Sequence, residues 1–229
     1  MNELSRRRVL GATTALAGAT VLGGLGSAPA TAADRAGTPA GSAKATTWTR
    51  SRSANGWKVL GEATSYGIEG SGRSVRLAGG DAATILLHVA RRFHYEIDQL
   101  RVGDVRGHRT SRQVEQPYES NYLSGTAIDI REAAYPLGAR AGFYPQELVV
   151  IRDVLAELDG VVAWGGDFTV PKESHFEIAL KPGHPKVRNV ARKITTWNAG
   201  PGGEGAGATD AFDAGRQKRA RTFAGRTAA

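Results

Sequence analysis

Residues 81–100 constrain the fold most, because their apolar side chains recur at helical spacing. The side chains that form this stripe are Ile85, Val89, Phe93, Ile97 and Leu100. Asp81 stands directly before the stripe and is expected to cap it. The pattern predicts one long amphipathic helix whose apolar face must be covered by another layer of structure.

A second helix is predicted over 145–158, with Pro145 at its first position and Gly160 after its end. Short runs with the length and composition of strands surround the two helices. They cover 55–60, 74–77, 161–164 and 174–178. We therefore expect an α+β fold, in which helices pack on a small, mainly antiparallel sheet.

The start of the chain has the features of an export signal. The twin-arginine pattern Ser5-Arg6-Arg7-Arg8-Val9-Leu10 precedes a mildly apolar stretch and the small residues Ala30-Thr31-Ala32. This order predicts a cleaved twin-arginine signal peptide over 1–32. A membrane anchor is the alternative, but the stretch is short and glycine-rich for a span of about 20 apolar residues. The mature chain is expected to lack a transmembrane segment and to lie in the cell wall or outside the cell.

Composition divides the rest of the chain. Residues 33–45 are mainly small and polar, which predicts a linker, and 46–198 is expected to form the folded core domain. Residues 199–229 are rich in glycine and then polar and basic, which predicts a disordered basic tail. The chain has no cysteine, so disulfides and thiolate metal ligands are excluded.

The charge of the chain bears on its partners. The formal net charge is +8. Outside a bacterium, a basic surface favours anionic cell-wall polymer as a partner. Nucleic acid is not expected, because the Lys and Arg residues are scattered and no binding motif accompanies them.

Two polar motifs mark a candidate site. The first is Ser120-Asn121-Tyr122-Leu123-Ser124-Gly125-Thr126-Ala127-Ile128-Asp129, and the second combines Trp164-Gly165-Gly166-Asp167 with His175-Phe176-Glu177. On a strand, His175 and Glu177 face the same side while Phe176 faces the core. That alternation suits a metal-binding histidine with a carboxylate partner.

The motifs resemble those of the zinc D-alanyl-D-alanine carboxypeptidase and L-alanyl-D-glutamate endopeptidase family over about 48–197. In that family Ser-x-His-x-x-Gly-x-Ala-x-Asp supplies two zinc ligands and a later His-Phe-Glu supplies the third. The resemblance implies the carboxypeptidase-like core, peptidoglycan peptides as ligands, and metal ligation by Asp129 and His175.

Two positions depart from the family's pattern. Tyr122 stands in place of the first histidine ligand, and its phenol, with a pKa of about 10, must lose a proton to bind zinc well. We expect it to pack beside Leu123 instead. Lys172 stands in place of the general-base carboxylate; an ammonium cannot act as a base at neutral pH and repels a divalent cation. An ion pair of Lys172 with Asp129 or Glu177 is an alternative role for this lysine.

Other residues are candidates for the remaining parts. Arg109 resembles the arginine with which the family holds a substrate carboxylate or an oxyanion, and Arg112 is the alternative. Glu173 is a carboxylate beside Lys172, although neighbouring side chains on an extended segment point to opposite faces. His108 is the candidate replacement ligand.

These residues leave three functions open. The first is an exported cell-wall protein that binds peptidoglycan peptides with weak or lost hydrolysis, and Tyr122 together with Lys172 favours it. The second is an active zinc peptidase with a substituted ligand and base, such as His108 and Glu173. The third is a secreted adhesin that uses its basic surface and tail. Zinc is the cofactor that the resemblance implies, and the two departures count against it.

Overall fold

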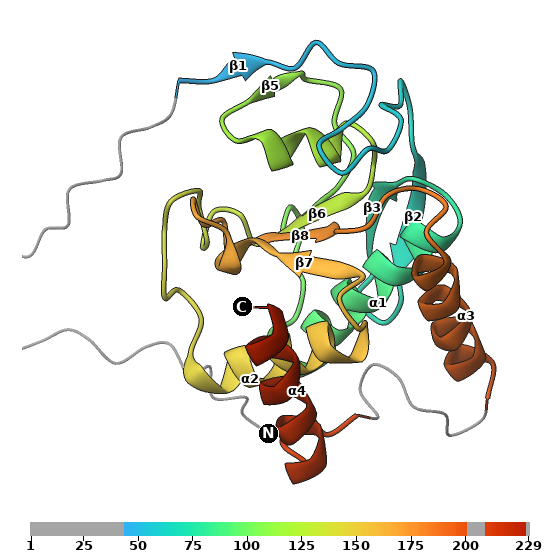
Figure 1. The fold of residues 1–229 in the computed structure, drawn as a ribbon, viewed down its shortest axis with the longest axis vertical. Coiled ribbons are helices and arrows are strands. Elements are labelled where there is room, and N and C mark those ends of the chain that lie inside the picture. Colours follow the sequence, from blue (N-terminus) through green and yellow to red (C-terminus); the bar gives the residue numbers. More distant parts are fainter. Residues whose placement is uncertain (1–43, 201–208, 228–229) are drawn as a thin grey trace, which may run out of the picture. The chain divides into compact units, whose positions relative to one another are not determined.

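The computed structural model describes residues 44–200 and 209–227, so the predicted signal peptide lies outside the described residues, as does the predicted linker up to residue 43. The largest sheet has four antiparallel strands in the order β4-β6-β8-β7 (Figure 1). These strands are β4 (Val105–Arg106), β6 (Ala127–Ile130), β7 (Val162–Trp164) and β8 (His175–Ile178). The predicted α+β fold with small antiparallel sheets is confirmed.

Two smaller antiparallel pairs complete the strands. They are β2 (Thr64–Ile68) with β3 (Arg73–Leu77), and β1 (Thr46–Thr47) with β5 (Gln113–Val114). The strand predicted over 74–77 is part of β3, and those predicted over 161–164 and 174–178 correspond to β7 and β8.

The strand predicted over 55–60 is wrong. The structure has only an isolated bridge between Arg52 and Lys58 in this part of the chain. The side-chain amide of Asn55 donates to the hydroxyl of Thr126 at 2.8 Å and to the carbonyl of Ile178 at 2.9 Å. Side-chain bonds of this kind hold the segment as a loop against the sheet and offer the backbone an alternative to strand pairing.

Helix α1 (Asp81–Glu96) forms the centre of the core, as its apolar stripe predicts. It ends four residues before the predicted end at residue 100. The N–H of Leu100 donates to Nδ1 of His94 at 3.0 Å, which replaces the helical bond at this point. The cap expected at Asp81 is also wrong, because Gly80, with φ 73°, precedes the helix and Asp81 is its first residue.

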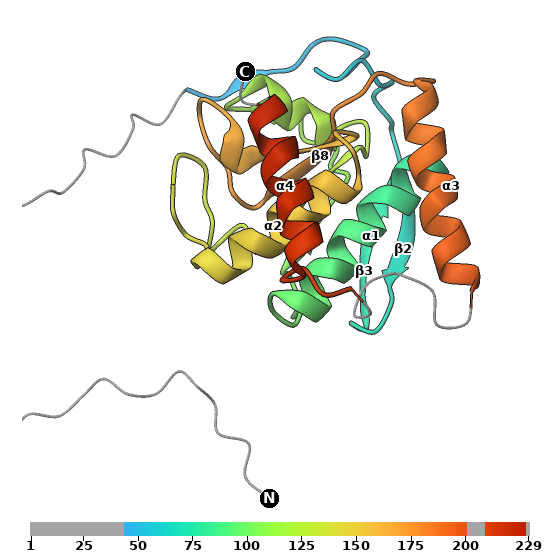
Figure 2. The ribbon, with the colours of Figure 1, turned by 60° about the horizontal axis from the view of Figure 1, so that its bottom comes forward.

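Helix α2 (Pro145–Glu157) begins at Pro145, as predicted. Gly160 follows its end with φ 75°, a left-handed conformation that glycine adopts without strain. Helix α1 packs against β6 and β8 and has α2 and a further helix, α3 (Pro185–Ala199), beside it (Figures 1 and 2). Helix α3 was not predicted from the sequence.

Helix α4 (Ala214–Thr227) lies in the predicted disordered tail, and that prediction is wrong for these residues. The helix packs along α2 (Figure 2). Ala220 is buried in the contact, and Arg216 pairs with Asp153 at 2.6 Å. Tertiary contacts therefore stabilise a helix whose composition alone is typical of a solvated segment. No helix among residues 44–200 and 209–227 is long and apolar enough to cross a membrane.

Candidate functional site

Strands β6 and β8 place the two predicted metal ligands side by side. Asp129 and His175 are direct partners in the antiparallel register, so their side chains lie on one face of the sheet. Ile128 and Phe176, the neighbouring pair, face the core and are 0% and 2% exposed. The predicted alternation, with Phe176 toward the core and His175 on the other face, is confirmed.

Tyr122 lies at the end of a short 3-10 helix, η1 (Pro117–Tyr122). Its ring is 1% exposed, and its hydroxyl lies 2.5 Å from Oδ1 of Asp129 and 2.5 Å from Nδ1 of His175. Burial and the charge of Asp129 raise the pKa of Tyr122 well above its ordinary value, so the phenol keeps its proton. Tyr122 is therefore a neutral bridge between Asp129 and His175.

The turn after Tyr122 needs a glycine. Gly125 has φ 66°, and a Cβ there would lie 2.5 Å from the backbone nitrogen of Ala78. Any residue with a Cβ at position 125 would therefore clash with the backbone of Ala78, so the turn requires glycine. The turn aligns η1 with β6 and so sets the position of Tyr122 relative to Asp129.

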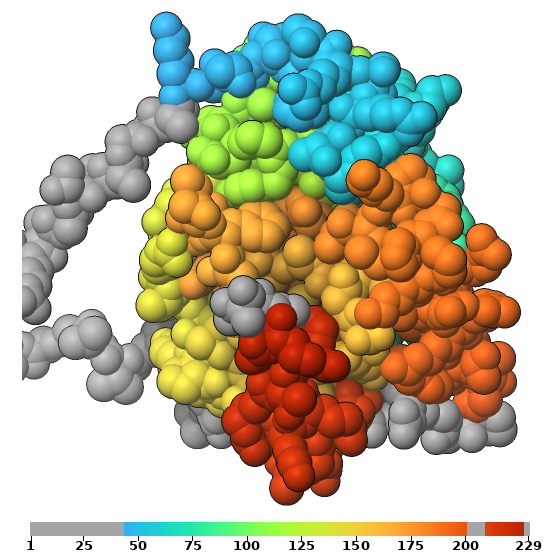
Figure 3. Space-filling view, viewed as in Figure 1, coloured from blue at the N-terminus to red at the C-terminus, as the bar shows by residue number. Residues whose placement is uncertain are grey.

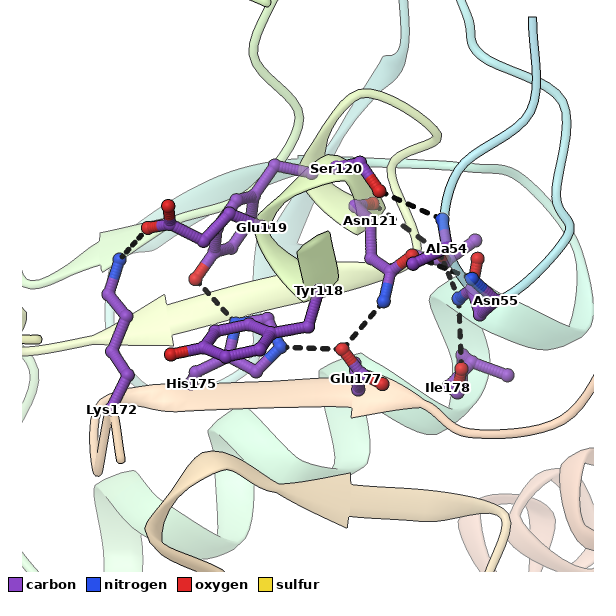
Figure 4. Close-up of polar contacts among 12 residues, drawn as sticks. Ala54, Asn55, Tyr118, Glu119, Ser120, Asn121, Lys172, His175, Glu177 and Ile178 are labelled. Atoms are coloured by element: carbon purple, nitrogen blue, oxygen red, sulfur yellow. Dashed lines mark hydrogen bonds and ion pairs between the residues drawn. The ribbon is translucent and has the colours of Figure 1, made fainter. Parts of the chain in front are cut away.

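A chain of polar contacts continues from His175 (Figure 4). Nε2 of His175 lies 2.8 Å from Oε2 of Glu177. The amide of Asn121 donates to the same oxygen at 2.6 Å. Both nitrogens of the imidazole therefore have a partner within the protein.

Lys172 reaches the cluster from the loop before β8 and is 1% exposed. Its Nζ lies 3.1 Å from Oδ2 of Asp129, 2.7 Å from Glu132 and 3.2 Å from Glu119. Burial alone lowers the pKa of a lysine, but the charge of Asp129 and the hydrogen bond to Glu132 outweigh it and raise the pKa of Lys172. The ion pair predicted between Lys172 and Asp129 is confirmed, and the ammonium is charged.

The Trp-Gly-Gly-Asp motif holds Lys172 in this position. The N–H of Lys172 donates to the carbonyl of Gly165 at 3.0 Å. A Cβ on Gly165 would lie 2.2 Å from the carbonyl oxygen of Lys172. The glycine therefore permits the close approach of the two backbones that directs the ammonium toward Asp129.

The residues present do not fit a zinc ion. Zinc needs ligands that offer free lone pairs. Here the Tyr122 hydroxyl donates to Asp129 and contacts Nδ1 of His175, and the Lys172 ammonium neutralises the carboxylate at 3.1 Å. Elsewhere in the described part of the chain, no group of three or more His, Cys, Asp or Glu residues is placed to hold a metal.

A pocket of ≈ 550 Å³ borders this cluster. The charged and aromatic side chains that line it are Arg76, Arg106, His108, Arg109, Tyr122, Asp129 and Glu132. The guanidinium of Arg109 lies 4.4 Å from the centre of the Tyr122 ring, a cation–π distance. Arginine side chains thus line a pocket next to the Lys172 cluster.

Arg109 has donors that the described residues leave unused. Its Nε and Nη2 are buried and have no hydrogen-bond partner in the described chain. The nearest carboxylate oxygen paired with it, Oε1 of Glu119, is 3.8 Å from Nη2, which is too long for a hydrogen bond. Buried donors without partners cost free energy, and a rotation of this side chain, which is 34% exposed, would let an anion in the pocket satisfy them.

The other predicted candidates are held elsewhere. The carboxylate of Glu173 accepts the N–H groups of Ala141 and Gly142, each at 2.8 Å, on the opposite side of the backbone from Lys172. His108 lines the pocket, but its Nε2 contacts the carbonyl of Leu60 at 3.1 Å. The structure therefore does not bring Glu173 or His108 into the polar cluster.

Arg112 is not at the site either. Its Nη1 donates to the carbonyls of Trp48 and Arg50, at 3.0 and 3.2 Å. Of the two candidate arginines, the structure thus brings Arg109 alone to the pocket.

Sequence reasoning missed Glu119, Glu132 and Tyr118. The two glutamates pair with Lys172, and the ring of Tyr118 lies 5.0 Å from that of His175. A signal for the glutamates was present, because they flank the motif that ends at Asp129. A lysine expected at a buried site requires carboxylates around it, and the flanks of that motif contain them.

We compared the chain with protein-family models, with curated proteins and with solved structures, and none of the three comparisons gives a match. Membership of the zinc peptidase family therefore stays a proposal.

Proposed function

We propose that this chain is an exported cell-wall protein with a D-alanyl-D-alanine carboxypeptidase-like fold, which binds peptidoglycan peptides and has lost zinc-dependent hydrolysis. The observation that carries the proposal is the set of contacts around Asp129. Lys172 and Tyr122 occupy both of its carboxylate oxygens. The carboxylate is therefore paired within the protein at both oxygens, and a metal ion bound to it would lie beside the Lys172 ammonium.

The loss of a base supports the same conclusion. Lys172 is charged and surrounded by carboxylates, so it has no lone pair with which to accept a proton from water. Glu173, the nearest carboxylate along the chain, is bound to two backbone N–H groups. No observation favours the alternative of an active peptidase that uses His108 and Glu173.

The pocket supports binding of a carboxylate. Peptidoglycan stem peptides end in a carboxylate group, and an arginine fork matches that group with two parallel hydrogen bonds. Nε and Nη2 of Arg109 are the donors that lack a partner among the described residues. We assign the terminal carboxylate of the peptide to these donors, which a rotation of the 34% exposed side chain turns toward the ligand, and the rest of the peptide to the ≈ 550 Å³ pocket.

Calorimetric titration of the full chain with a stem peptide that ends in D-alanyl-D-alanine tests the binding. We expect Arg109→Met to weaken binding by about tenfold, since a hydrogen bond to a charged group contributes about 1.5 kcal/mol or more. Arg112→Met is the matched control and should bind like the original chain, because its guanidinium bonds to backbone carbonyls away from the pocket. Equal losses in the two variants would contradict the assignment.

Elemental analysis and chromatography of the same peptide after incubation test the loss of hydrolysis. The original chain should retain no stoichiometric zinc after dialysis and should release no D-alanine. The double variant Tyr122→His, Lys172→Glu should take up zinc, whereas Tyr122→His alone should not, because the ammonium remains beside Asp129. One tightly bound zinc per original chain, with peptide turnover, overturns the proposal.

A further inference from the structure

The excess positive charge of the chain is concentrated on two helices. Helices α3 and α4 carry nine Lys and Arg residues, four and five respectively, and no Asp or Glu. The whole chain has 30 Lys and Arg against 22 Asp and Glu. Without these two helices, 21 basic residues would stand against 22 acidic ones, so the helices account for the whole net charge of +8.

Most of these basic side chains point to solvent. Lys186 and Arg216 pair with acids of the same domain, at 3.0 and 2.6 Å. The remaining seven are exposed and have no acidic partner within 4.0 Å in the described part of the chain. They are Arg188, Arg192, Lys193, Lys218, Arg219, Arg221 and Arg226. We call these seven residues the basic face.

The two helices flank one groove. A pocket of ≈ 470 Å³ is lined by Lys193 and Trp197 of α3 and by Arg216 and Arg219 of α4. Figure 3 shows α4 (red) and much of α3 (orange) on the same side of the molecule. The basic face is therefore a surface to which both helices contribute, and it lies on elements that do not line the pocket beside Lys172.

The acids in the groove do not neutralise the basic face, because they have other partners. Asp153 pairs with Arg92 and Arg216, at 2.9 and 2.6 Å. Glu157 pairs with Arg92 at 2.5 Å, and Asp159 pairs with Lys186. A polyanion that lies along the two helices would therefore meet cations whose charge is not already compensated.

We propose that the basic face binds a polymer of repeating phosphate groups. Five of its seven residues are arginines, and the guanidinium fork matches phosphate oxygens in pairs. A flexible phosphate polymer can follow both helices and release its counterions as each cation contacts it.

A membrane surface fits this face less well. A helix that lies in a membrane interface inserts an apolar side opposite its basic side. In α4 that side is occupied, because Ala220 is buried and Phe223 packs against the core that includes α2. The helix thus has no free apolar side to insert.

Binding of the full chain to fluorescently labelled long-chain polyphosphate, measured over a range of salt concentrations, tests the proposal. The α3 variant Arg188→Gln, Arg192→Gln and the α4 variant Lys218→Gln, Arg219→Gln should each bind about tenfold more weakly. Each should also reduce the slope of log affinity against log salt by about 1.5, since each lost phosphate contact removes about 0.7 to 0.9. The control variant Lys58→Gln, Arg101→Gln removes the same charge at exposed positions on other elements and should change affinity less than twofold.

Several results would overturn the proposal. If the control variant loses as much affinity as the helix variants, binding reflects net charge alone. If double-stranded DNA or vesicles with anionic lipids bind more tightly than polyphosphate at equal salt, the partner class is wrong. Circular dichroism of each variant shows whether a loss of affinity comes from unfolding. If a helix variant keeps both its melting curve and its affinity for polyphosphate, the basic face is not the binding surface.

Discussion

Arg92 and Lys172 are the most deeply buried Lys and Arg residues of the described chain, and each lies among three carboxylates. Arg92 is 0% exposed and contacts Glu96, Asp153 and Glu157 at 2.5, 2.9 and 2.5 Å. Lys172 is 1% exposed and contacts Glu119, Asp129 and Glu132 at 3.2, 3.1 and 2.7 Å. A histidine also contacts a glutamate in each region, His88 with Glu157 and His175 with Glu177.

The two clusters differ in what carries the carboxylates. Those around Arg92 come from α1 and α2, and their side chains are 11%, 4% and 3% exposed. Those around Lys172 come from η1, from β6 and from the loop after β6, and Glu132 is 32% exposed at the edge of the pocket. Both clusters border a pocket, but Asp153 and Glu157 of the Arg92 cluster are only 4% and 3% exposed there, whereas Glu132 of the Lys172 cluster is 32% exposed. The surroundings of a buried cation, more than the cation itself, thus distinguish a scaffold from a candidate site.

The largest expected effect is that of Arg92→Met. The substitution removes the cation shared by three carboxylates that are at most 11% exposed, and Arg216 remains close to two of them but does not replace it at Glu96. We expect a cost of about 3–5 kcal/mol. Urea unfolding should show a loss of this size in the free energy of unfolding. Lys186→Met removes an exposed pair with Asp159 and should cost less than about 1 kcal/mol. If Arg92→Met lowers the free energy of unfolding as little as Lys186→Met does, the Arg92 cluster does not stabilise the fold more than an exposed ion pair.

The second expected effect is a dependence of stability on acid pH. Burial alone would raise the pKa of Glu157, but the hydrogen bond with His88 and the charge of Arg92 outweigh it and lower this pKa to about 2. Arg216 lies 3.5 Å away and adds positive charge. The ionised carboxylate therefore stabilises the fold fully above pH 4.5, and this contribution of about 3 kcal/mol is lost as the pH falls toward about 2.

Urea unfolding between pH 5 and pH 2 measures this loss. Glu157→Gln should flatten the pH dependence by about 3 kcal/mol. Glu62→Gln, at an exposed position, should keep the dependence of the original chain. Parallel curves for the two variants would show that Glu157 is not the group responsible.

A smaller effect is expected for Lys172→Met. Glu132 can take up water from the pocket, and the guanidinium of Arg109 remains near Glu119, so we expect a loss of about 2 kcal/mol. The measurement is urea unfolding at pH 7, with the exposed Lys58→Met as control. A loss greater than that of Arg92→Met would reverse the ranking of the two clusters.

The smallest effect is expected for Tyr122→Phe. The substitution removes the hydroxyl that contacts Asp129 and His175, while Lys172 still pairs with Asp129. We expect a loss of about 1–2 kcal/mol by thermal unfolding. Tyr95→Phe, at a side chain that is 51% exposed, should cost less than about 0.5 kcal/mol. Equal melting temperatures for the two variants would show that the hydroxyl does not join the strands.

The parts of the fold that local patterns specify could be predicted. The apolar stripe through Ile85 and Phe93 correctly predicted α1. Pro145 and Gly160 correctly predicted where α2 begins and ends. The alternation of side-chain direction along a strand correctly predicted that His175 and Phe176 of β8 point to opposite faces of the sheet. Each of these features depends on residues a few positions apart, so the sequence contains the whole signal.

The parts that depend on distant partners could not be predicted. Helix α4 has few apolar residues, and its stability depends on Asp153 and α2, which lie about 60 residues earlier in the chain. The sequence suggested Asp129 for Lys172, and Glu119 and Glu132 flank the same motif, but only the folded chain shows that both glutamates contact the ammonium. The run after the turn dipeptide Asn55-Gly56 was predicted as a strand, because the bonds of Asn55 to Thr126 and Ile178 leave no local pattern.

The opposite directions of Lys172 and Glu173 have a consequence for how the site can change. One peptide unit separates a cation that contacts Asp129 from an anion that binds the N–H groups of Ala141 and Gly142. Gain of a single residue between Glu173 and β8, whose pairing with β6 fixes the position of His175, would place Glu173 where Lys172 now lies and reverse the sign of the local charge. The electrostatic character of this site is thus set by loop length as much as by residue type, and an insertion could alter it without any substitution.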